Sequence, residues 1–177
     1  MRRLGILRAG LAGLAAVSTV AAQAADTPAN CLSEEEIAAL TVYVMPQLIT
    51  AAQAGCKAYL AKDGFLAIDG TAMAQRYTAK ADTVWQQAKS AFMKFGGDNK
   101  SKKSEDFANL SDAALRPLVS GLIEQEVAKD IQPKSCHDIE RLAKVLNQLE
   151  PDTTGALVSV IASLAIGNKK KPNVCEA

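Results

Sequence analysis

The sequence predicts an all-α protein, a bundle of five or six helices stapled by two disulfides. Three observations support this fold class. Apolar residues recur at helical spacing along most of the 177 residues, and such spacing is typical of amphipathic helices. No alternating apolar and polar pattern of useful length indicates a β-strand. Four cysteines follow what looks like an export signal, and cysteines in exported chains are usually paired.

The N-terminus has the features of a secretory signal peptide. Arg2 and Arg3 supply a positive charge, an apolar stretch follows, and an Ala-Gln-Ala sequence ends at residue 24, as cleavage sites require. We therefore expect a signal peptide at 1–24 and a single domain at 25–177, in the periplasm or secreted. No transmembrane segment is expected after signal removal, because a spanning helix needs ~20 unbroken apolar residues.

The charge balance argues against a nucleic-acid partner. The chain has 20 basic and 19 acidic residues, and the signal peptide removes three arginines, so the mature charge is 17 − 19 = −2. Proteins that bind nucleic acids usually carry a strongly basic face. We therefore expect no nucleic-acid partner for this protein.

Two helices are predicted before residue 64. Ser33 and Glu36 form a capping box at the start of the first. Pro46 should interrupt it, because proline lacks an amide hydrogen and clashes with the preceding turn. A second helix then runs to about Gly64. The third, from about 70 to 95, carries an aromatic stripe that Gly96 and Gly97 end.

The rest of the chain predicts a charged flexible loop near 97–111 and three more helices. The fourth is capped by Ser111 and absorbs Pro117 as a kink. The fifth starts after Cys136 with Asp138 as its cap. The sixth, at 156–167, has almost no polar side, so we expect it to be the central buried helix.

The four cysteines allow three pairings, and the helix lengths favour one of them. The fifth helix leads away from Cys136 and the sixth returns to the same end. The α-carbons of Cys136 and Cys175 can therefore lie within the ~7 Å that a disulfide requires. Cys31 must then pair with Cys56, although a straight helix would separate them by ~36 Å. This pairing requires a sharp corner at Pro46. A gentle kink would instead demand crossed pairings.

No catalytic or metal-binding motif emerges from the chain. His137 is the only histidine and directly follows Cys136, but no C-x-x-C pair or nucleophile elbow accompanies it. The acids Glu34 to Glu36 suit a helix N-terminus without any metal, and Glu124 and Glu126 point in different directions on a helix. We predict a non-enzymatic protein with no cofactor and no metal.

Two features are candidates for binding. One is the aromatic stripe of the third helix, which is either core or a surface for an apolar ligand or partner; its residues are Tyr77, Trp85, Phe92 and Phe95. The other is a basic run in the C-terminal tail that could make weak contact with the envelope; its residues are Lys169, Lys170 and Lys171.

Several short sequences carry a resemblance to known proteins: Cys-Leu-Ser from Cys31, Arg-Tyr at Tyr77, Arg-Pro-Leu-Val at Pro117, and the C-terminal Cys175. With these the chain resembles small exported four-cysteine helical proteins of alphaproteobacteria. It is also similar, more faintly, to the disulfide-stapled helical pilotins of secretion systems, which are usually lipidated, whereas no lipobox precedes Cys31.

The sequence therefore predicts a protein that acts through protein–protein interaction, as an adaptor, an inhibitor or an immunity-type partner. The alternative is a carrier of an apolar small molecule or lipid, which the apolar sixth helix and the aromatic stripe would suit.

Overall fold

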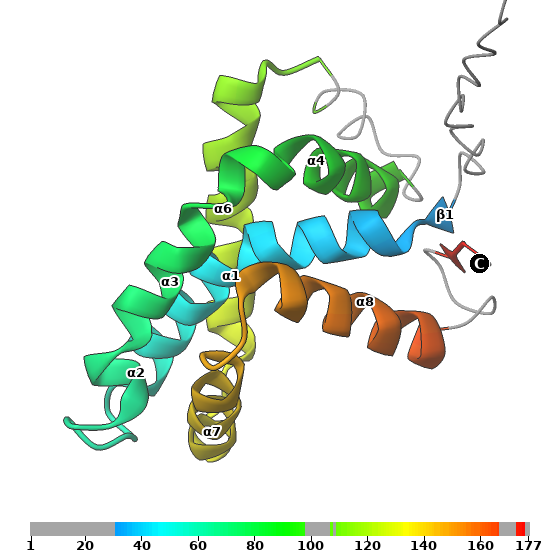
Figure 1. The fold of residues 1–177 in the computed structure, drawn as a ribbon. Coiled ribbons are helices and arrows are strands. Elements are labelled where there is room, and N and C mark those ends of the chain that lie inside the picture. The colour runs from blue at the N-terminus through cyan, green and yellow to red at the C-terminus, as the bar shows by residue number, and fades with distance from the viewer. Residues whose placement is uncertain (1–30, 98–106, 108, 167–172, 176–177) are drawn as a thin grey trace, which may run out of the picture.

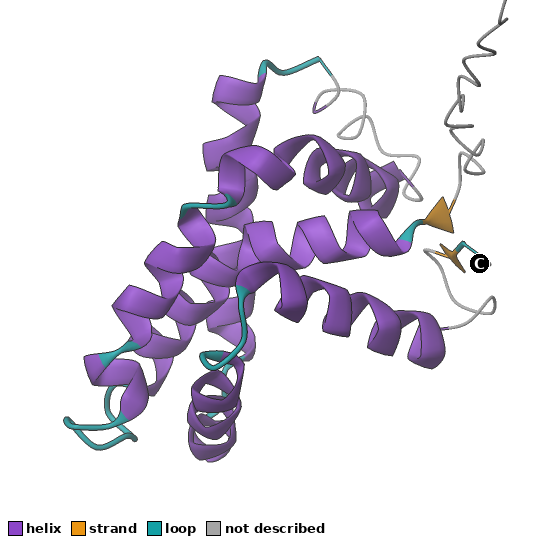
Figure 2. Ribbon diagram, in the orientation of Figure 1, coloured by secondary structure: helices purple, strands orange, loops and turns teal. Residues whose placement is uncertain are grey.

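The computed structural model describes residues 31–97, 107, 109–166 and 173–175. Within these ranges the chain forms seven α-helices, one 3-10 turn and two very short strands (Figures 1 and 2). The all-α prediction is therefore confirmed. The elements are β1 (Cys31–Leu32), α1 (Glu34–Cys56), α2 (Phe65–Ile68), α3 (Gly70–Thr78), α4 (Ala81–Gly97), α6 (Asp112–Asp130), η1 (Pro133–Ser135), α7 (Cys136–Leu146), α8 (Pro151–Ile166) and β2 (Asn173–Val174).

Helix α1 lies at the centre of the molecule (Figure 1). It packs against α4 and α8 at its N-terminal half, α3 along its C-terminal half, and α6. By length and composition alone α1 could cross a membrane. Its position explains that composition, because a helix buried against neighbours on several sides is apolar on several sides.

Helix α1 is continuous through Pro46, so the predicted break there is wrong. The side chain of the next residue, Gln47, compensates locally. Its amide nitrogen lies 3.0 Å from the carbonyl oxygens of both Tyr43 and Val44, and its amide oxygen accepts from Ser120 Oγ at 3.1 Å. Packing against α3, α4, α6 and α8 and these added hydrogen bonds outweigh the local cost of proline.

Other boundaries differ in detail from the prediction. The capping box of Ser33 is confirmed, and α6 begins after Ser111 with Pro117 inside it. The N-cap of α7 is Ser135 rather than Asp138. The predicted third helix is two helices, because a turn after Thr78 lets α3 follow the C-terminal half of α1 while α4 packs against its N-terminal half.

All four cysteines form disulfides, but the favoured pairing is wrong. The bridges are Cys31–Cys175, with α-carbons 5.0 Å apart, and Cys56–Cys136, with α-carbons 5.4 Å apart. The continuous α1 holds Cys31 and Cys56 at its opposite ends, so each must pair elsewhere. Parallel pairing of β1 with β2 brings the C-terminal tail to Cys31. These are the crossed pairings that a helix without a sharp corner demands.

Helix α8 is peripheral, which corrects the expectation that the last helix is central. One side packs on α1 at close range: a Cβ added at Gly155 would lie 2.8 Å from the carbonyl oxygen of Ala38. Only glycine permits that approach. The opposite side of α8 faces outward.

Three predicted features lie outside the described residues. They are the signal peptide at 1–24, most of the charged loop at 97–111, and the lysine run at 169–171.

Candidate interaction surface

The aromatic stripe contributes to the core rather than to a surface. Tyr77 and Trp85 are 0% and 1% exposed. The Tyr77 hydroxyl donates to Thr154 Oγ1 at 3.0 Å, which fastens α3 to α8. The ring of Trp85 lies 4.9 Å from that of Tyr43, and the Arg116 guanidinium sits 4.7 Å above it. Neither Tyr77 nor Trp85 is accessible to a partner.

The other two members of the stripe lie further along α4. Phe92 is half-buried and its ring meets that of Phe107 edge-on at 5.9 Å. Phe95 belongs to α4, but its side chain is outside the description.

The adjacent Cys136 and His137 form no reactive site. Cys136 is fully buried within its disulfide, and His137 is exposed on the first turn of α7. Among the described residues no three His, Cys, Asp or Glu side chains gather closely enough to hold a metal ion. His137 is therefore a bystander on the surface.

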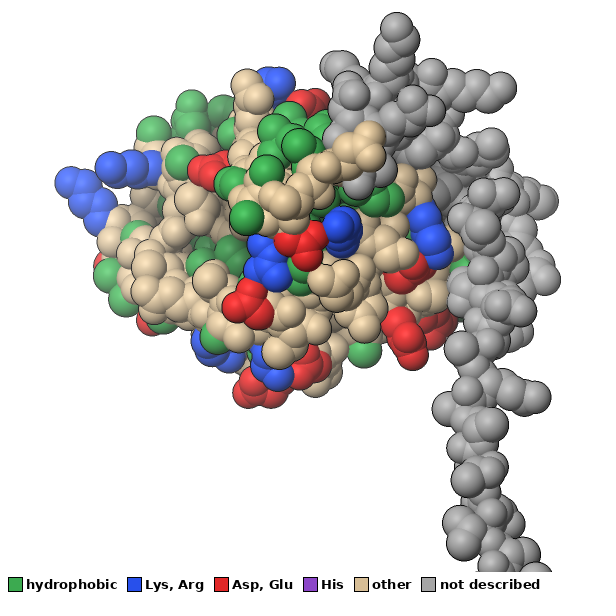
Figure 3. All heavy atoms as spheres, turned by 90° about the horizontal axis from the view of Figure 1, so that it is seen from above, with side chains coloured by type: hydrophobic (Ala, Val, Ile, Leu, Met, Phe, Trp, Pro, Cys, Tyr) green, Lys and Arg blue, Asp and Glu red, His purple; other side chains and the backbone are tan. Residues whose placement is uncertain are grey.

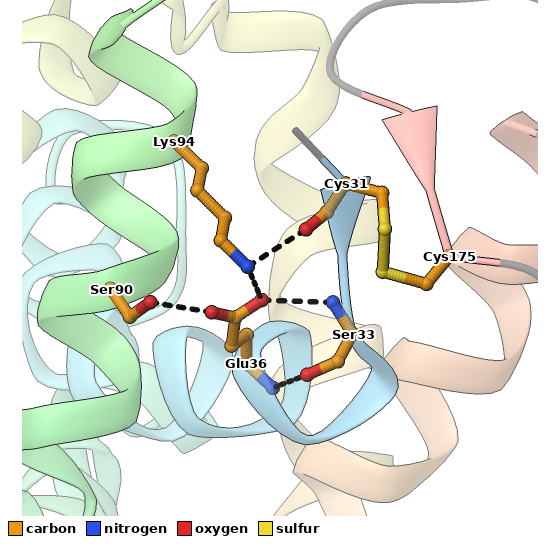
Figure 4. A network of polar contacts seen from close by, with 6 residues as sticks. All are labelled: Cys31, Ser33, Glu36, Ser90, Lys94 and Cys175. Atoms are coloured by element: carbon orange, nitrogen blue, oxygen red, sulfur yellow. Dashed lines mark hydrogen bonds and ion pairs between the residues drawn. A yellow bond between two sulfur atoms is a disulfide. The ribbon is translucent and has the colours of Figure 1, made fainter. Parts of the chain in front are cut away.

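A polar cluster joins three elements at the N-terminus of α1 (Figure 4). The carboxylate of Glu36 accepts from the Ser33 amide at 2.9 Å, from Ser90 Oγ at 2.5 Å and from Lys94 Nζ at 2.7 Å. Lys94 also donates to the carbonyl of Cys31 at 2.8 Å. This network ties α4 to α1 and β1, next to the Cys31–Cys175 bridge.

The electrostatics of Glu36 fit a structural role. Burial by itself raises the pKa of this carboxyl, but the hydrogen bonds from Lys94, Ser90 and Ser33 outweigh it, so the pKa lies below its ordinary value of 4.5. The carboxylate is ionised at neutral pH, and both oxygens already accept hydrogen bonds. A general base that acts at neutral pH has a raised pKa, whereas the lowered pKa of Glu36 and its three contacts fit a link between α1, α4 and β1.

Among the hollows along α1, two have apolar side chains in their lining. The first, about 320 Å³, is a shallow groove lined by four apolar and four polar residues. Its Asp152 pairs with Lys80 at 2.8 Å, and Thr83 donates to the Lys80 carbonyl at 2.7 Å. Asp152 and Thr83 are therefore both engaged with Lys80. The lining of the groove is Glu35, Ala38, Ala39, Val42, Thr83, Val84, Gln87 and Asp152.

The second hollow, about 380 Å³, lies where α1 ends and the chain turns into α2. Its lining combines four apolar residues with two lysines and one glutamine. The glutamine, Gln53, is held in place because its amide nitrogen donates to the carbonyl of Leu66 at 2.7 Å. The lining is Gln53, Lys57, Leu60, Ala61, Lys62, Leu66 and Ala67.

The outward side of α8 exposes apolar residues, although this helix was expected to be buried. Four large apolar residues lie exposed at spacings of three, four and seven, and two alanines flank them. The exposed fractions are 45% for Leu157, 46% for Val160, 54% for Ile161 and 82% for Leu164, and Ala156 and Ala165 are exposed as well. We call these six residues the α8 face.

No charged residue interrupts the α8 face, because the chain from 153 to 166 contains none. The side of α8 toward α1 instead carries small residues, namely Gly155, Ser159 and Ala162. This division is visible in the sequence and could have indicated the exposed side of the helix. Small residues permit close helix packing, so the large side chains must point the other way. A view from above shows a different face, on which acidic and basic side chains lie among hydrophobic and other atoms (Figure 3).

Comparisons with known proteins supply no relative: no protein-family model, curated protein or solved structure matches the chain. The fold and its bridges define the class as an all-α protein stapled by two disulfides, which is compatible with an exported protein.

Proposed function

We propose that this is a non-enzymatic periplasmic or secreted protein that acts through protein–protein interaction, with the α8 face as its contact surface. The observation that supports the proposal is the set of four large apolar side chains exposed together on a stretch of α8, residues 153–166, that contains no charge. Scattered apolar residues are normal on protein surfaces, but a contiguous patch indicates a binding site. Adaptors, inhibitors and immunity-type partners all act in this way.

The size of the α8 face suits a contact with one helix or shallow groove of a partner. From the exposed fractions, the patch measures about 400 Å², within the range of functional patches on monomeric proteins. Residues at spacings of three, four and seven are the usual anchors when a helix docks against an apolar partner.

The α8 face is also held rigidly, which favours binding. Gly155 sets α8 directly on α1, the buried Tyr77–Thr154 hydrogen bond fastens its first turn, and Ser163 Oγ donates to Glu34 at 3.1 Å near its end. A partner then has little disorder to remove on binding.

Site-specific photo-crosslinking in the oxidising compartment tests the proposal. A crosslinker placed at Leu164 should give a discrete adduct, and the additional change Ile161→Glu should abolish it. Ile68 is a matched control, because it is 64% exposed but lies on α2. Equal adducts from Leu164 and Ile68, or none from either, would contradict the proposed surface.

Export is the second part of the proposal, and the predicted signal peptide and the two disulfides support it. N-terminal sequencing of the mature protein should begin at Ala25. A mature chain that retains Met1 and free thiols would contradict export.

A second candidate function, the carriage of an apolar small molecule, draws on the 380 Å³ hollow at the end of α1. Its volume lies within the range of ligand pockets, and Leu60, Leu66 and Ala67 contribute apolar lining beside Lys57 and Lys62. Native mass spectrometry after gentle purification tests it, because a carrier should retain an apolar ligand. A bare polypeptide mass would count against it.

A further inference from the structure

We infer that the α8 face binds a second copy of this chain, with the two α8 helices antiparallel about a twofold axis between Val160 and Ile161. The inference rests on the proposed function, because it names the partner of the same surface. It follows from the order of residues along the face, their lack of charge and the area they expose.

The α8 face reads almost the same in both directions. From its centre between residues 160 and 161, the exposed residues run outward as a β-branched residue, a leucine and an alanine on each side. Leu157 and Leu164 are equidistant from the centre, as are Ala156 and Ala165. A twofold contact requires such a self-complementary patch, since each copy presents the same residues to the other.

Helix geometry decides which side chains meet in that contact. With 100° per residue, Leu157 and Leu164 lie near the middle of the face, whereas Val160 and Ile161 lie on either side of it. An antiparallel pair therefore stacks Leu157 on Leu164 of the second copy at both ends. At the centre, Val160 and Ile161 each lie beside their own counterparts.

The absence of charge favours the second copy over a partner selected by ion pairs. Twofold contact places every residue near a copy of itself or of its symmetry mate, so a charge on the face would meet a like charge. The chain from 153 to 166 contains no charge, and self-contact therefore involves no repulsion. Nor does the face offer groups with which a partner of opposite charge could be recognised.

The exposed area indicates a reversible dimer. Two faces of about 400 Å² bury about 800 Å² in total, below the 1,200 Å² or more of stable complexes. The dimer should therefore form and dissociate with concentration.

Sedimentation velocity over a wide concentration range tests this inference on the intact mature protein. The wild type should shift from monomer to dimer as concentration rises. Ile161→Glu places two carboxylates beside each other at the axis and should raise the dissociation constant at least about tenfold. The control Ile68→Glu should leave it unchanged. A wild type that stays monomeric throughout would overturn the inference.

Cysteine cross-linking tests the register. All four native cysteines are in disulfides, so an introduced thiol is the only free one. Ile161→Cys should form a covalent dimer on oxidation, because the two copies of residue 161 are offset by only about 1.5 Å along the helix axes. Leu157→Cys should form no such dimer, since the two copies of residue 157 are offset by about 10 Å along the helix axes. That offset is too large for a disulfide.

The outcomes separate the two proposals. Equal cross-linking of both cysteine variants would overturn the antiparallel arrangement. A monomeric protein whose crosslinker at Leu164 still captures a different protein would overturn self-association and leave the proposed function standing. A monomer that gives no adduct at all would overturn both.

Discussion

Removal of the Cys56–Cys136 bridge should cost about 4 kcal/mol of unfolding free energy. The bridge joins the C-terminal end of α1 to the start of α7, 80 residues further on. With Cys31–Cys175 intact, the shorter loop that it closes comprises the 25 residues from Cys31 to Cys56 and the 39 from Cys136 to Cys175. A loop of this length corresponds to about 4 kcal/mol in the chain-entropy model.

The double substitution Cys56→Ala/Cys136→Ala makes this change without leaving a free thiol. Both residues are 0% exposed, so the loss of two sulfur atoms also leaves a small void that adds to the cost. A typical domain has about 5–15 kcal/mol of stability in total, and the variant should therefore fold but unfold at a much lower urea concentration.

Urea denaturation is the assay, followed by circular dichroism and by the fluorescence of Trp85, the only tryptophan. The urea concentration at the midpoint should fall. The unfolding free energy should also depend more steeply on urea concentration, because a less constrained unfolded chain exposes more surface. Cys31→Ala/Cys175→Ala is the matched variant. A loss below about 1 kcal/mol would refute the reasoning, since it would mean that the bridge barely restricts the unfolded ensemble.

Three further predictions concern the contacts around α1 and α8. Tyr77→Phe leaves the buried Thr154 hydroxyl without its partner and should cost about 1–3 kcal/mol in urea denaturation. Gly155→Ala forces a Cβ to within 2.8 Å of the Ala38 carbonyl and should cost about 1–3 kcal/mol by the same measurement. The lowered pKa of Glu36 means that its contribution is present above its ordinary value of 4.5 and is lost as pH falls through the folded pKa. Glu36→Gln should therefore flatten the acid limb of melting temperature against pH, and an unchanged limb would contradict this.

Local sequence signals predicted the helices well. Ser33 with Glu36 marks the start of α1 through a capping box, and Ser111 marks the start of α6 by its extended N-cap backbone, without a capping hydrogen bond from its side chain. The presence of disulfides likewise followed from four cysteines behind a predicted export signal. Such features require no knowledge of distant contacts.

The disulfide pairing could not be predicted, because it depends on whether Pro46 breaks a helix. Proline carries a local cost, but the packing of α3, α4, α6 and α8 around α1 is a tertiary effect that a sequence pattern does not show. The predicted pairing of both bridges depended on Pro46. A corner there would let Cys31 reach Cys56, whereas the continuous helix keeps them apart. One wrong local inference therefore reversed the whole pairing.

The candidate surface was missed for a different reason. A helix that is apolar all round is predicted to be central. Among these helices α1 packs against α3, α4, α6 and α8, whereas α8 leaves one apolar side exposed. What separates them is the size of the side chains: α8 has small residues on one side and large ones on the other. Hydrophobicity alone does not reveal that difference. Of the two interpretations of the aromatic stripe, core packing is the correct one for Tyr77 and Trp85.

The two bridges and the α8 face are mechanically connected. The disulfides attach at the two ends of α1, so the central helix is fixed at both ends. Helix α8 lies on α1 through Gly155 and is followed by β2, whose neighbour Cys175 belongs to one of the bridges. The α8 face is thus presented by a scaffold that has already lost its freedom to move. Binding by a small patch then retains more of its apolar free energy, because little conformational entropy is left to lose on contact.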